Sequence, residues 1–227
     1  MYFRGTQRSY ADMTDTDDSK KPNIEEREDG PLVVKNVSKM IAADGSDAGA
    51  RPAMALCRCG ASKNKPFCDG SHMGIEFKTS PGEPSSRDRL YNYEGAEITV
   101  HFNPHLCSHA AKCGAMLKPV FDASADPWIN PDAGSAANIK AVVNACPSGA
   151  LTYSEKGGDP CHIEDGECVI EIEEHGPFHV RNVELDGAKW GTKACPEKYV
   201  LCRCGASRNK PFCDGAHADI GWRDDQD

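Results

Sequence analysis

One stretch of sixteen residues, rich in thiols and repeated almost unchanged, constrains the fold of this chain more than any other feature. Its first copy has the spacing C-x-C-x8-C-x3-H, formed by Cys57, Cys59, Cys68 and His72. The second copy keeps that spacing with Cys202, Cys204, Cys213 and His217. Three thiolates and one imidazole make a complete four-ligand set for a tetrahedral metal centre. Two copies of the set therefore predict two equivalent metal sites.

The ligand set suits either Zn²⁺ or an iron–sulfur cluster, so the number of ligands does not choose between them. Structural zinc sites usually begin with C-x2-C or a wider spacing. The tighter C-x-C pair favours a two-iron cluster, in which Cys57 and Cys59 hold one iron while Cys68 and His72 hold the other. A pair of zinc-binding loops is the alternative that this set leaves open.

The first loop ends in the letters CDGSH, from Cys68 to His72, and the second loop ends in CDGAH, which differs only at Ala216. At these residues the chain resembles the CDGSH (mitoNEET-like) iron–sulfur family. The resemblance implies one [2Fe–2S] cluster at each loop, bound by the three cysteines and the histidine of that loop. Proteins of this type are homodimers, so two copies in one chain imply an intramolecular pseudo-dimer with pseudo-twofold symmetry.

The repeat extends beyond the ligand loops. The pattern G-P-x-x-V-[K/R]-N-V occurs at residues 30–37 and again at 176–183, and an isoleucine and an aromatic residue follow each ligand histidine. The chain therefore predicts two units, 30–77 and 176–223, each with a strand, a connection, a ligand loop and a closing aromatic strand. Units shorter than about 50 residues are marginal alone, so we expect each to bury its strands against the other.

The remaining segments differ in composition. Residues 1–29 are polar and acidic, which predicts a disordered tail. Residues 78–89 are rich in Ser, Pro and Gly and are interpreted as a linker, and residues 156–175 as a connector. Between them, residues 90–155 predict a strand at 97–102, a helix at 110–117, a helix at 135–145 and a strand at 150–153, with Ser135 as an N-cap. The expected fold class is α+β.

The 90–155 segment carries Cys107, Cys113 and the pair Cys146-Pro147. Bacterial ferredoxins ligate a cluster through C-x2-C-x2-C and a remote C-P, and here Ala110 takes the place of the middle cysteine. The segment resembles a divergent single-cluster ferredoxin domain. Three thiolates suffice for a [3Fe–4S] cluster, and a [4Fe–4S] cluster would need a fourth ligand from water, a small molecule or a neighbour such as His109. A ferredoxin-like scaffold without a cluster is the alternative.

Three further cysteines fit no metal-binding pattern, because C-x6-C is a weak signal. They are expected to be ordinary thiols, buried or free: Cys161, Cys168 and Cys195. Four histidines in or beside strand-like segments are expected to be structural: His101, His105, His175 and His179.

Composition limits the possible partners. The chain has 227 residues, 12 cysteines, a net charge of −9 and a pI of about 5.4, which argues against nucleic-acid binding. It shows no export signal and no apolar run long enough to span a membrane, so the cysteines predict thiolate-bound clusters in a reducing cytoplasm. Each ligand loop is locally basic, and its cations and the hydroxyls of Ser62 and Ser207 are expected to stabilise an anionic cluster.

No arrangement for nucleophilic or acid–base catalysis emerges, so we do not expect an enzyme. The first functional hypothesis is single-electron transfer to a redox partner protein by a monomer. The second is donation of clusters to an apo-acceptor, or redox or iron sensing, because a histidine ligand is protonated as it dissociates and cluster loss should quicken below about pH 6.5. A zinc-stabilised interaction module is a third, less favoured hypothesis.

Overall fold

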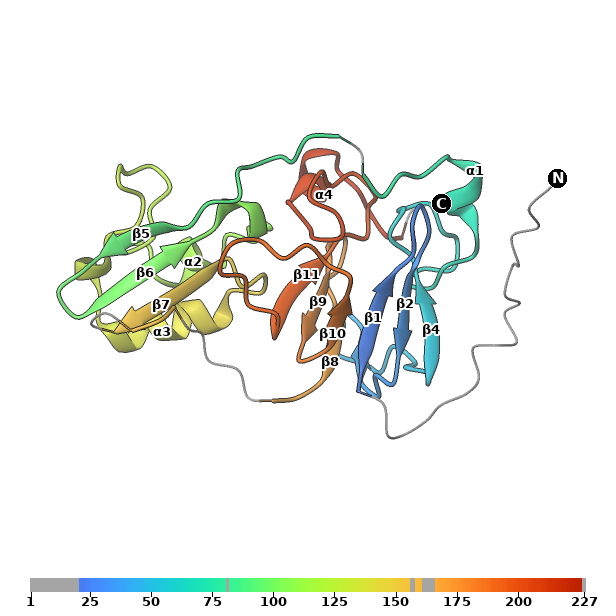
Figure 1. Cartoon of the computed structure of the whole chain (residues 1–227), viewed down its shortest axis with the longest axis horizontal. Coiled ribbons are helices and arrows are strands. Elements are labelled where there is room, and N and C mark those ends of the chain that lie inside the picture. The colour runs from blue at the N-terminus through green and yellow to red at the C-terminus, as the bar shows by residue number, and fades with distance from the viewer. Residues whose placement is uncertain (1–20, 81, 156–157, 161–165, 226–227) are drawn as a thin grey trace.

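The computed structural model describes residues 21–80, 82–155, 158–160 and 166–225. The fold is α+β, with three small sheets and short helices. Figure 1 shows three bodies in a row: a central domain (residues 90–155), a second half (166–225) and a first half (21–80). None of the described helices is long and apolar enough to cross a membrane.

The two halves have the same order of elements, as their sequence repeat requires. The first half contains β1 (Asn23–Glu26), β2 (Leu32–Lys35), β3 (Met40–Ile41), β4 (Ala53–Leu56) and α1 (Ser71–Gly74). The second half contains β8 (Val169–Ile172), β9 (Phe178–Arg181), β10 (Glu184–Asp186), β11 (Lys198–Leu201) and α4 (Ala216–Asp219). Each ligand loop lies between the last strand of its half and the short helix that follows.

The halves exchange strands. One sheet has the order β10-β1-β2-β4, and the other has the order β11-β9-β8-β3. Strand β10 of the second half pairs in parallel with β1, and β3 of the first half pairs in parallel with β8. Residues from both halves form one hydrophobic core, including Ile24, Leu32, Ile170 and Phe178. Strands this short cannot bury an adequate core alone, and the exchange makes the two halves one folded body.

The expected disorder of residues 1–29 is wrong in part, because residues 23–26 form β1. The expected connector at 156–175 likewise contains β8 at 169–172. Both strands carry an isoleucine that is completely buried, Ile24 and Ile170, six residues before the Gly-Pro of the repeat. The Ile-Glu dipeptide at this position in both copies is the signal that would have found them. Residues 1–20 lie outside the described residues.

The closing aromatic strand expected at the end of each unit is also wrong. The short helices α1 and α4 follow the ligand loops, and the described residues after them form no strand. The aromatic residues after the two loops, Phe77 and Trp222, contact other parts of the CDGSH halves through their side chains instead. The Phe77 ring is buried beneath Arg58, and the Trp222 indole donates a hydrogen bond to the carbonyl oxygen of Gly60 in the other half.

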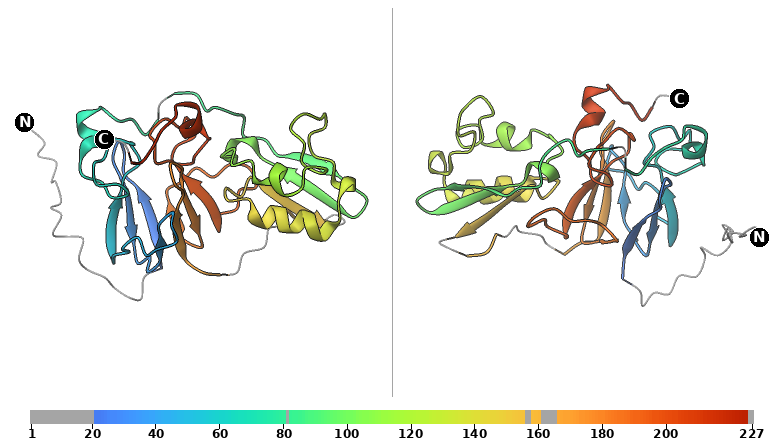
Figure 2. Two further views of the ribbon diagram at one scale, coloured as in Figure 1. Left: turned by 180° about the vertical axis from the view of Figure 1, so that it is seen from behind. Right: turned by 45° about the horizontal axis from the view of Figure 1, so that its top comes forward.

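The central domain is a three-stranded antiparallel sheet with two helices. Its elements are β5 (Tyr91–Glu94), β6 (Ile98–Phe102), α2 (Lys112–Met116), α3 (Ala136–Ala145) and β7 (Leu151–Glu155). The predicted elements all occur near their expected positions, and β5 was not predicted. Ser135 caps α3 by accepting a hydrogen bond from the N–H of Asn138. Both views in Figure 2 show this domain beside the second half, with the first half on the far side.

Candidate metal centres

The four predicted ligands of each loop gather in two pairs. In the first loop the sulfur atoms of Cys57 and Cys59 are 3.6 Å apart, and Cys68 Sγ lies 3.4 Å from Nδ1 of His72. In the second loop the corresponding distances are 3.8 Å between Cys202 Sγ and Cys204 Sγ, and 3.4 Å between Cys213 Sγ and His217 Nδ1. In both histidines, Nδ1 is therefore the nitrogen that faces the thiols.

These distances are those expected of two ligands on one tetrahedral ion. Bonds of about 2.3 Å to sulfur and about 2.0 Å to nitrogen place two sulfurs about 3.8 Å apart, and sulfur and nitrogen about 3.5 Å apart. Within the part of the chain that the structure describes, no three Cys, His, Asp or Glu side chains form a group that could hold a single metal ion. The donors thus fit two ions with two protein ligands each, as in a two-iron cluster.

The C-x-C pair of each loop favours one thiolate. The hydrogen bond between Cys59 and Cys57, together with nearby backbone N–H groups, lowers the pKa of Cys57 to about 6, while burial acts in the opposite direction. Cys204 acts in the same way on Cys202 and lowers its pKa to about 7. A thiolate is the form of cysteine that binds metal, so half of each pair is prepared for a cation.

Burial favours the neutral thiol of the third cysteine in each loop. Burial raises the pKa of Cys68 and of Cys213, although the backbone N–H groups of Gly70 and Gly215 point at these sulfurs from 3.4 Å. Burial also lowers the pKa of His217, which favours the neutral imidazole that ligates metals. A bound metal ion would displace the thiol protons and supply the positive charge that the buried site lacks.

The expected role of the loop serines is not what the structure shows. The hydroxyl of Ser62 donates to the carbonyl oxygen of Phe67, and that of Ser207 donates to Phe212, each at 2.7 Å. Each hydroxyl also accepts from a backbone N–H two residues further on. These serines therefore hold the shape of the loop. Backbone N–H groups, rather than hydroxyls, point at the sulfurs.

The basic residues of the loops divide into two kinds. Arg58 and Arg203 are buried and directed away from the thiols of their own half. Arg203 donates to the carbonyl oxygens of Glu173 and Gly176 and to Asp224. Lys210 differs, because the thiols of the second loop act on its charge and it lowers the pKa of Cys202. Lys210 thus acts on a thiol of its own loop, whereas the charges of Arg58 and Arg203 act across the axis, on Cys202 and on Cys57.

The two loops meet at the pseudo-twofold axis. Cys59 and Cys204 form an isolated antiparallel bridge between the halves. The glycines that follow them, Gly60 and Gly205, have positive φ, and a Cβ atom on either would lie 2.4–2.5 Å from the carbonyl oxygen of the opposite cysteine. Only glycine allows this approach of the two backbones. The repeat therefore needs C-x-C-G in both copies.

The three cysteines of the central domain line one mostly apolar cavity. Cys107 follows the 3-10 helix Pro104–Leu106, Cys113 lies in α2, and Cys146 directly follows α3. Burial raises the pKa of Cys107 to about 12, and the charges of the other two thiols act in the same direction. Three cysteines that line one cavity without forming a site for a single ion fit a cluster in which each cysteine would bind a different iron. Ala110, at the position of the missing ferredoxin cysteine, is part of the same lining.

His109 does not face this cavity. Its backbone N–H donates to Cys107 Sγ at 3.4 Å, but its side chain lines a separate cleft that faces the second half. It is therefore not placed as the fourth ligand that we considered for a [4Fe–4S] cluster.

The other cysteines and histidines have polar partners within the protein. The Cys168 thiol donates to the carbonyl oxygen of Asn182 at 2.9 Å, and Cys195 is buried with its sulfur 3.6 Å from Glu197. The four histidines expected to be structural all contact side-chain or backbone oxygens: His101, His105, His175 and His179. Cys161 lies outside the described residues.

Sequence reasoning missed the polar residues that join the central domain to the second half. Lys198 is almost completely buried, and its ammonium group donates to the carbonyl oxygens of Val143 and Asn144 at the end of α3. The first repeat has Ala53 at the corresponding strand position. A buried lysine that replaces an alanine between two otherwise similar repeats was the available signal.

Comparison with known proteins agrees with this arrangement. The family described as "Iron-binding zinc finger CDGSH type" matches residues 29–73 and 175–218, and the family described as "Divergent 4Fe-4S mono-cluster" matches residues 93–156. Two curated relatives, each called Uncharacterized protein YjdI, come from Escherichia coli K12 and O157:H7. Each is 39% identical over 64 residues, which is 28% of this chain and 84% of the relative. No solved structure matches the chain.

The matched segments coincide with the three places where the structure gathers cysteines. Two of them hold the paired ligands of the repeated loops, and the third holds the cavity lined by Cys107, Cys113 and Cys146. The chain therefore belongs to the CDGSH iron-binding family and is an iron–sulfur protein in which two CDGSH domains flank a divergent 4Fe-4S mono-cluster domain.

Proposed function

We propose that the protein transfers single electrons through two [2Fe–2S] clusters, each bound by three cysteines and one histidine. The observation that carries the proposal is the separation of each ligand set into two pairs, at 3.4–3.8 Å within a pair. Cys57 with Cys59, and Cys68 with His72, would each hold one iron of the first cluster, and the second loop would do the same. A [2Fe–2S] cluster stores one electron without breaking a bond.

The proposal includes a third cluster on Cys107, Cys113 and Cys146. Three thiols around one apolar cavity support a [3Fe–4S] cluster directly. A [4Fe–4S] cluster would need one further ligand from solvent or a small molecule, because His109 faces away. In this function the chain is an electron carrier and not an enzyme, its partner is a redox protein, and it acts as a monomer.

The chain's own residues would bind, support and shield the clusters. Backbone N–H groups at 3.4 Å from the sulfurs of Cys68, Cys204 and Cys213 would stabilise the reduced, more negative state and so raise the potential. Burial of both C-x-C pairs and of Cys213 would exclude water from these ligands. The Lys210 ammonium would add positive charge beside the second cluster.

Quantitation of iron, sulfide and zinc on anaerobically purified protein, together with electron paramagnetic resonance, tests the proposal. Two [2Fe–2S] clusters require about four irons per chain, and the central cluster raises this to about seven or eight. Dithionite should produce S = 1/2 signals from the CDGSH sites. A colourless protein that contains zinc and no sulfide would show instead a zinc-stabilised module.

Cluster donation or sensing is the second candidate, favoured by the histidine ligand of each loop. If His72 and His217 dissociate on protonation, the visible absorbance of the clusters should decay faster below about pH 6.5. Replacing both histidines with cysteine should slow that decay. Transfer of the spectrum to an apo-ferredoxin would identify a donor, whereas reversible bleaching by a reductase would identify a carrier.

A further inference from the structure

The two CDGSH loops are nearly identical in sequence but lie in different surroundings. Cys213 is 1% exposed, whereas its counterpart Cys68 is only half-buried. Asn209 is 3% exposed, whereas Asn64 is exposed. Met73, next to the first ligand histidine, is 75% exposed. The second loop is thus covered by the rest of the molecule, and the first loop faces solvent.

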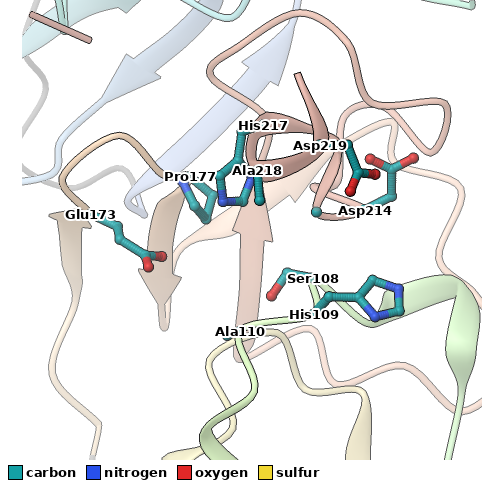
Figure 3. Close-up of a pocket in the computed structure, with 10 residues that line it drawn as sticks. Ser108, His109, Ala110, Glu173, Pro177, Asp214, His217, Ala218 and Asp219 are labelled. Atoms are coloured by element: carbon teal, nitrogen blue, oxygen red, sulfur yellow. The ribbon is translucent and has the colours of Figure 1, made fainter. Parts of the chain in front are cut away.

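The cover over the second loop is the cysteine loop of the central domain. A Cβ atom on Gly215 would lie 3.1 Å from the carbonyl oxygen of Ser108 and 3.2 Å from Cβ of His109. Gly215 lies between the ligands Cys213 and His217, and Ser108 directly follows Cys107. Figure 3 shows Ser108 and His109 opposite the helix that carries His217, across a cleft of about 270 Å³.

Hydrogen bonds hold this contact in place. The side-chain amide of Asn209 donates to the carbonyl oxygen of His105, just before the central cysteine loop, at 2.9 Å. Its oxygen accepts from the N–H of Ser85 in the linker at 2.9 Å. Lys198 holds the end of α3 next to Cys146 through two further bonds. The central cysteines are therefore fixed against the second loop from two sides.

The second loop also touches the first. Cys59 and Cys204, one ligand from each loop, form the antiparallel bridge at the pseudo-twofold axis. The second site is thus the only one of the three described cysteine sites for which the structure gives contacts to both of the others. The order along the molecule is central site, second site, first site, as the order of the bodies in Figure 1 indicates.

We propose that the second CDGSH site is the middle member of a linear electron relay, coupled to the central site through the contact of Ser108 and His109 with Gly215. The relay rests on the function proposed above. In each step one electron leaves a reduced site, which is oxidised, and enters its neighbour, which is reduced. No bond or proton moves. A one-electron donor or acceptor protein exchanges electrons at the exposed first site.

The contact keeps the distance for electron transfer between the central site and the second CDGSH site short. Three peptide steps and one contact separate Cys107 from Cys213, which limits the distance between their Cα atoms to about 18 Å. The shortest approach in this contact is to a backbone atom, the carbonyl oxygen of Ser108, and the Cβ and ring Cδ2 of His109 lie beside it.

Progressive power saturation of the electron paramagnetic resonance signals tests the relay on the fully loaded chain reduced with dithionite. A paramagnetic central cluster should speed the spin relaxation of the second site, so that its signal saturates at a several-fold higher power than that of the first. His217→Cys shifts the g-values of the second site and so assigns its signal. In a Cys113→Ser/Cys146→Ser variant, the difference between the two sites should disappear.

A matched pair of variants tests the contact itself, with hydrogen–deuterium exchange as a measurement that does not depend on the clusters. Asn209→Ala should raise exchange in residues 105–111 several-fold and lower the saturation power of the second site. Asn64→Ala, the same change in the exposed loop, should alter neither. Faster exchange in Asn209→Ala with unchanged relaxation of the second site would contradict the assigned contact.

The relay is overturned if both CDGSH signals saturate alike in protein whose iron and sulfide show all three clusters, or if the first site relaxes faster. Absence of the clusters from purified wild-type protein is a different result. It would overturn the proposed function, since no redox centres would remain to couple.

Discussion

At the scale of single residues, the buried arginines beside the first cysteines of each loop are structural anchors. Arg203 is 4% exposed, stacks between the Phe178 and Trp222 rings, and donates to two carbonyl oxygens of the turn before β9. Arg58 contacts Glu26 and the carbonyl oxygen of Gly30 in the first half. Each guanidinium thus joins its ligand loop to the turn that follows the first strand of its half, β1 or β8.

Replacing Arg203 with alanine should lower the Tm by about 10 °C. The change leaves buried carbonyl oxygens and Asp224 without their donor, which costs about 3 kcal/mol. Arg208→Ala, a change at an exposed position of the same loop, is the control and should shift the Tm by less than about 2 °C. Calorimetry on both variants checks this, and equal small shifts would contradict the anchoring role.

The buried His101 in β6 makes the stability of the central domain depend on pH. Burial lowers its pKa, and its ring nitrogens contact Asn92 and Ser154 at 2.8 Å. The neutral form therefore stabilises the fold fully above the unfolded pKa of about 6.5, and this contribution is lost as the pH falls below it.

Lowering the pH from 8 to 5 should therefore reduce the Tm more in the wild-type protein than in His101→Gln, which cannot titrate. The difference between the two proteins in the free energy of unfolding can grow by at most about 1.4 kcal/mol per pH unit. Any loss of cluster ligands at low pH is common to both proteins and cancels in the comparison. Parallel Tm curves would show that His101 does not titrate with unfolding.

At the scale of elements, the exchanged strands decide how the molecule unfolds. Strand β1 pairs with β2 of its own half and with β10 of the other, and β8 has the equivalent position with β9 and β3. Each sheet therefore contains strands from both halves around one core. Neither half can lose its sheet without disturbing the other.

The pseudo-symmetry predicts that Ile24→Ala and Ile170→Ala destabilise the protein equally. Both side chains are completely buried at matching positions in β1 and β8, and the loss of such a side chain costs about 2–5 kcal/mol. Each variant should unfold the CDGSH body in one transition, about 5–15 °C below the wild type. Ile75→Ala, at a 52% exposed position, serves as the control. Two separate transitions in either variant would contradict a shared core.

At the scale of the whole molecule, the central domain makes two duplicate sites unequal. It lies against the second half, where Lys198 and Asn209 fasten it. The ligand loop of the second half becomes buried, while that of the first half keeps Cys68 half-buried and Met73 exposed. Two sites with the same candidate ligands should therefore differ in how readily solvent and chelators reach them.

Removal of iron by a chelator should accordingly be biphasic. We expect the fast phase to belong to the first site, because its ligands are more accessible. His72→Cys should slow only the fast phase, and His217→Cys only the slow one. Absorbance decay with excess chelator at constant pH measures both rates. A single phase for the two CDGSH clusters would show that the burial of the second loop does not protect it.

How much of the fold and of the candidate sites could be predicted from the sequence depends on how far apart in the chain the interacting residues lie. The ligand pairs were predictable because a C-x-C spacing and a C-x3-H spacing bring their donors together within a few residues of chain. The helix from Ala136 to Ala145 was predictable because its cap at Ser135 and the Cys146-Pro147 end are local signals. The strands β1 and β8 were missed, because segments of only four residues become strands when partners on both sides complete the sheet.

The sequence alone determined the spacing of the candidate ligands, the repeat that contains them and the separate domain inserted between the copies, since each of these depends on residue type and local spacing. Only the tertiary structure decided which strands the halves exchange, where the arginines and serines of the loops point, and which CDGSH site the central domain covers. These outcomes depend on contacts between residues far apart in the chain, such as Lys198 with Val143 and Gly215 with Ser108. A duplicated sequence specifies two equal sites, and packing against a single central domain makes them different.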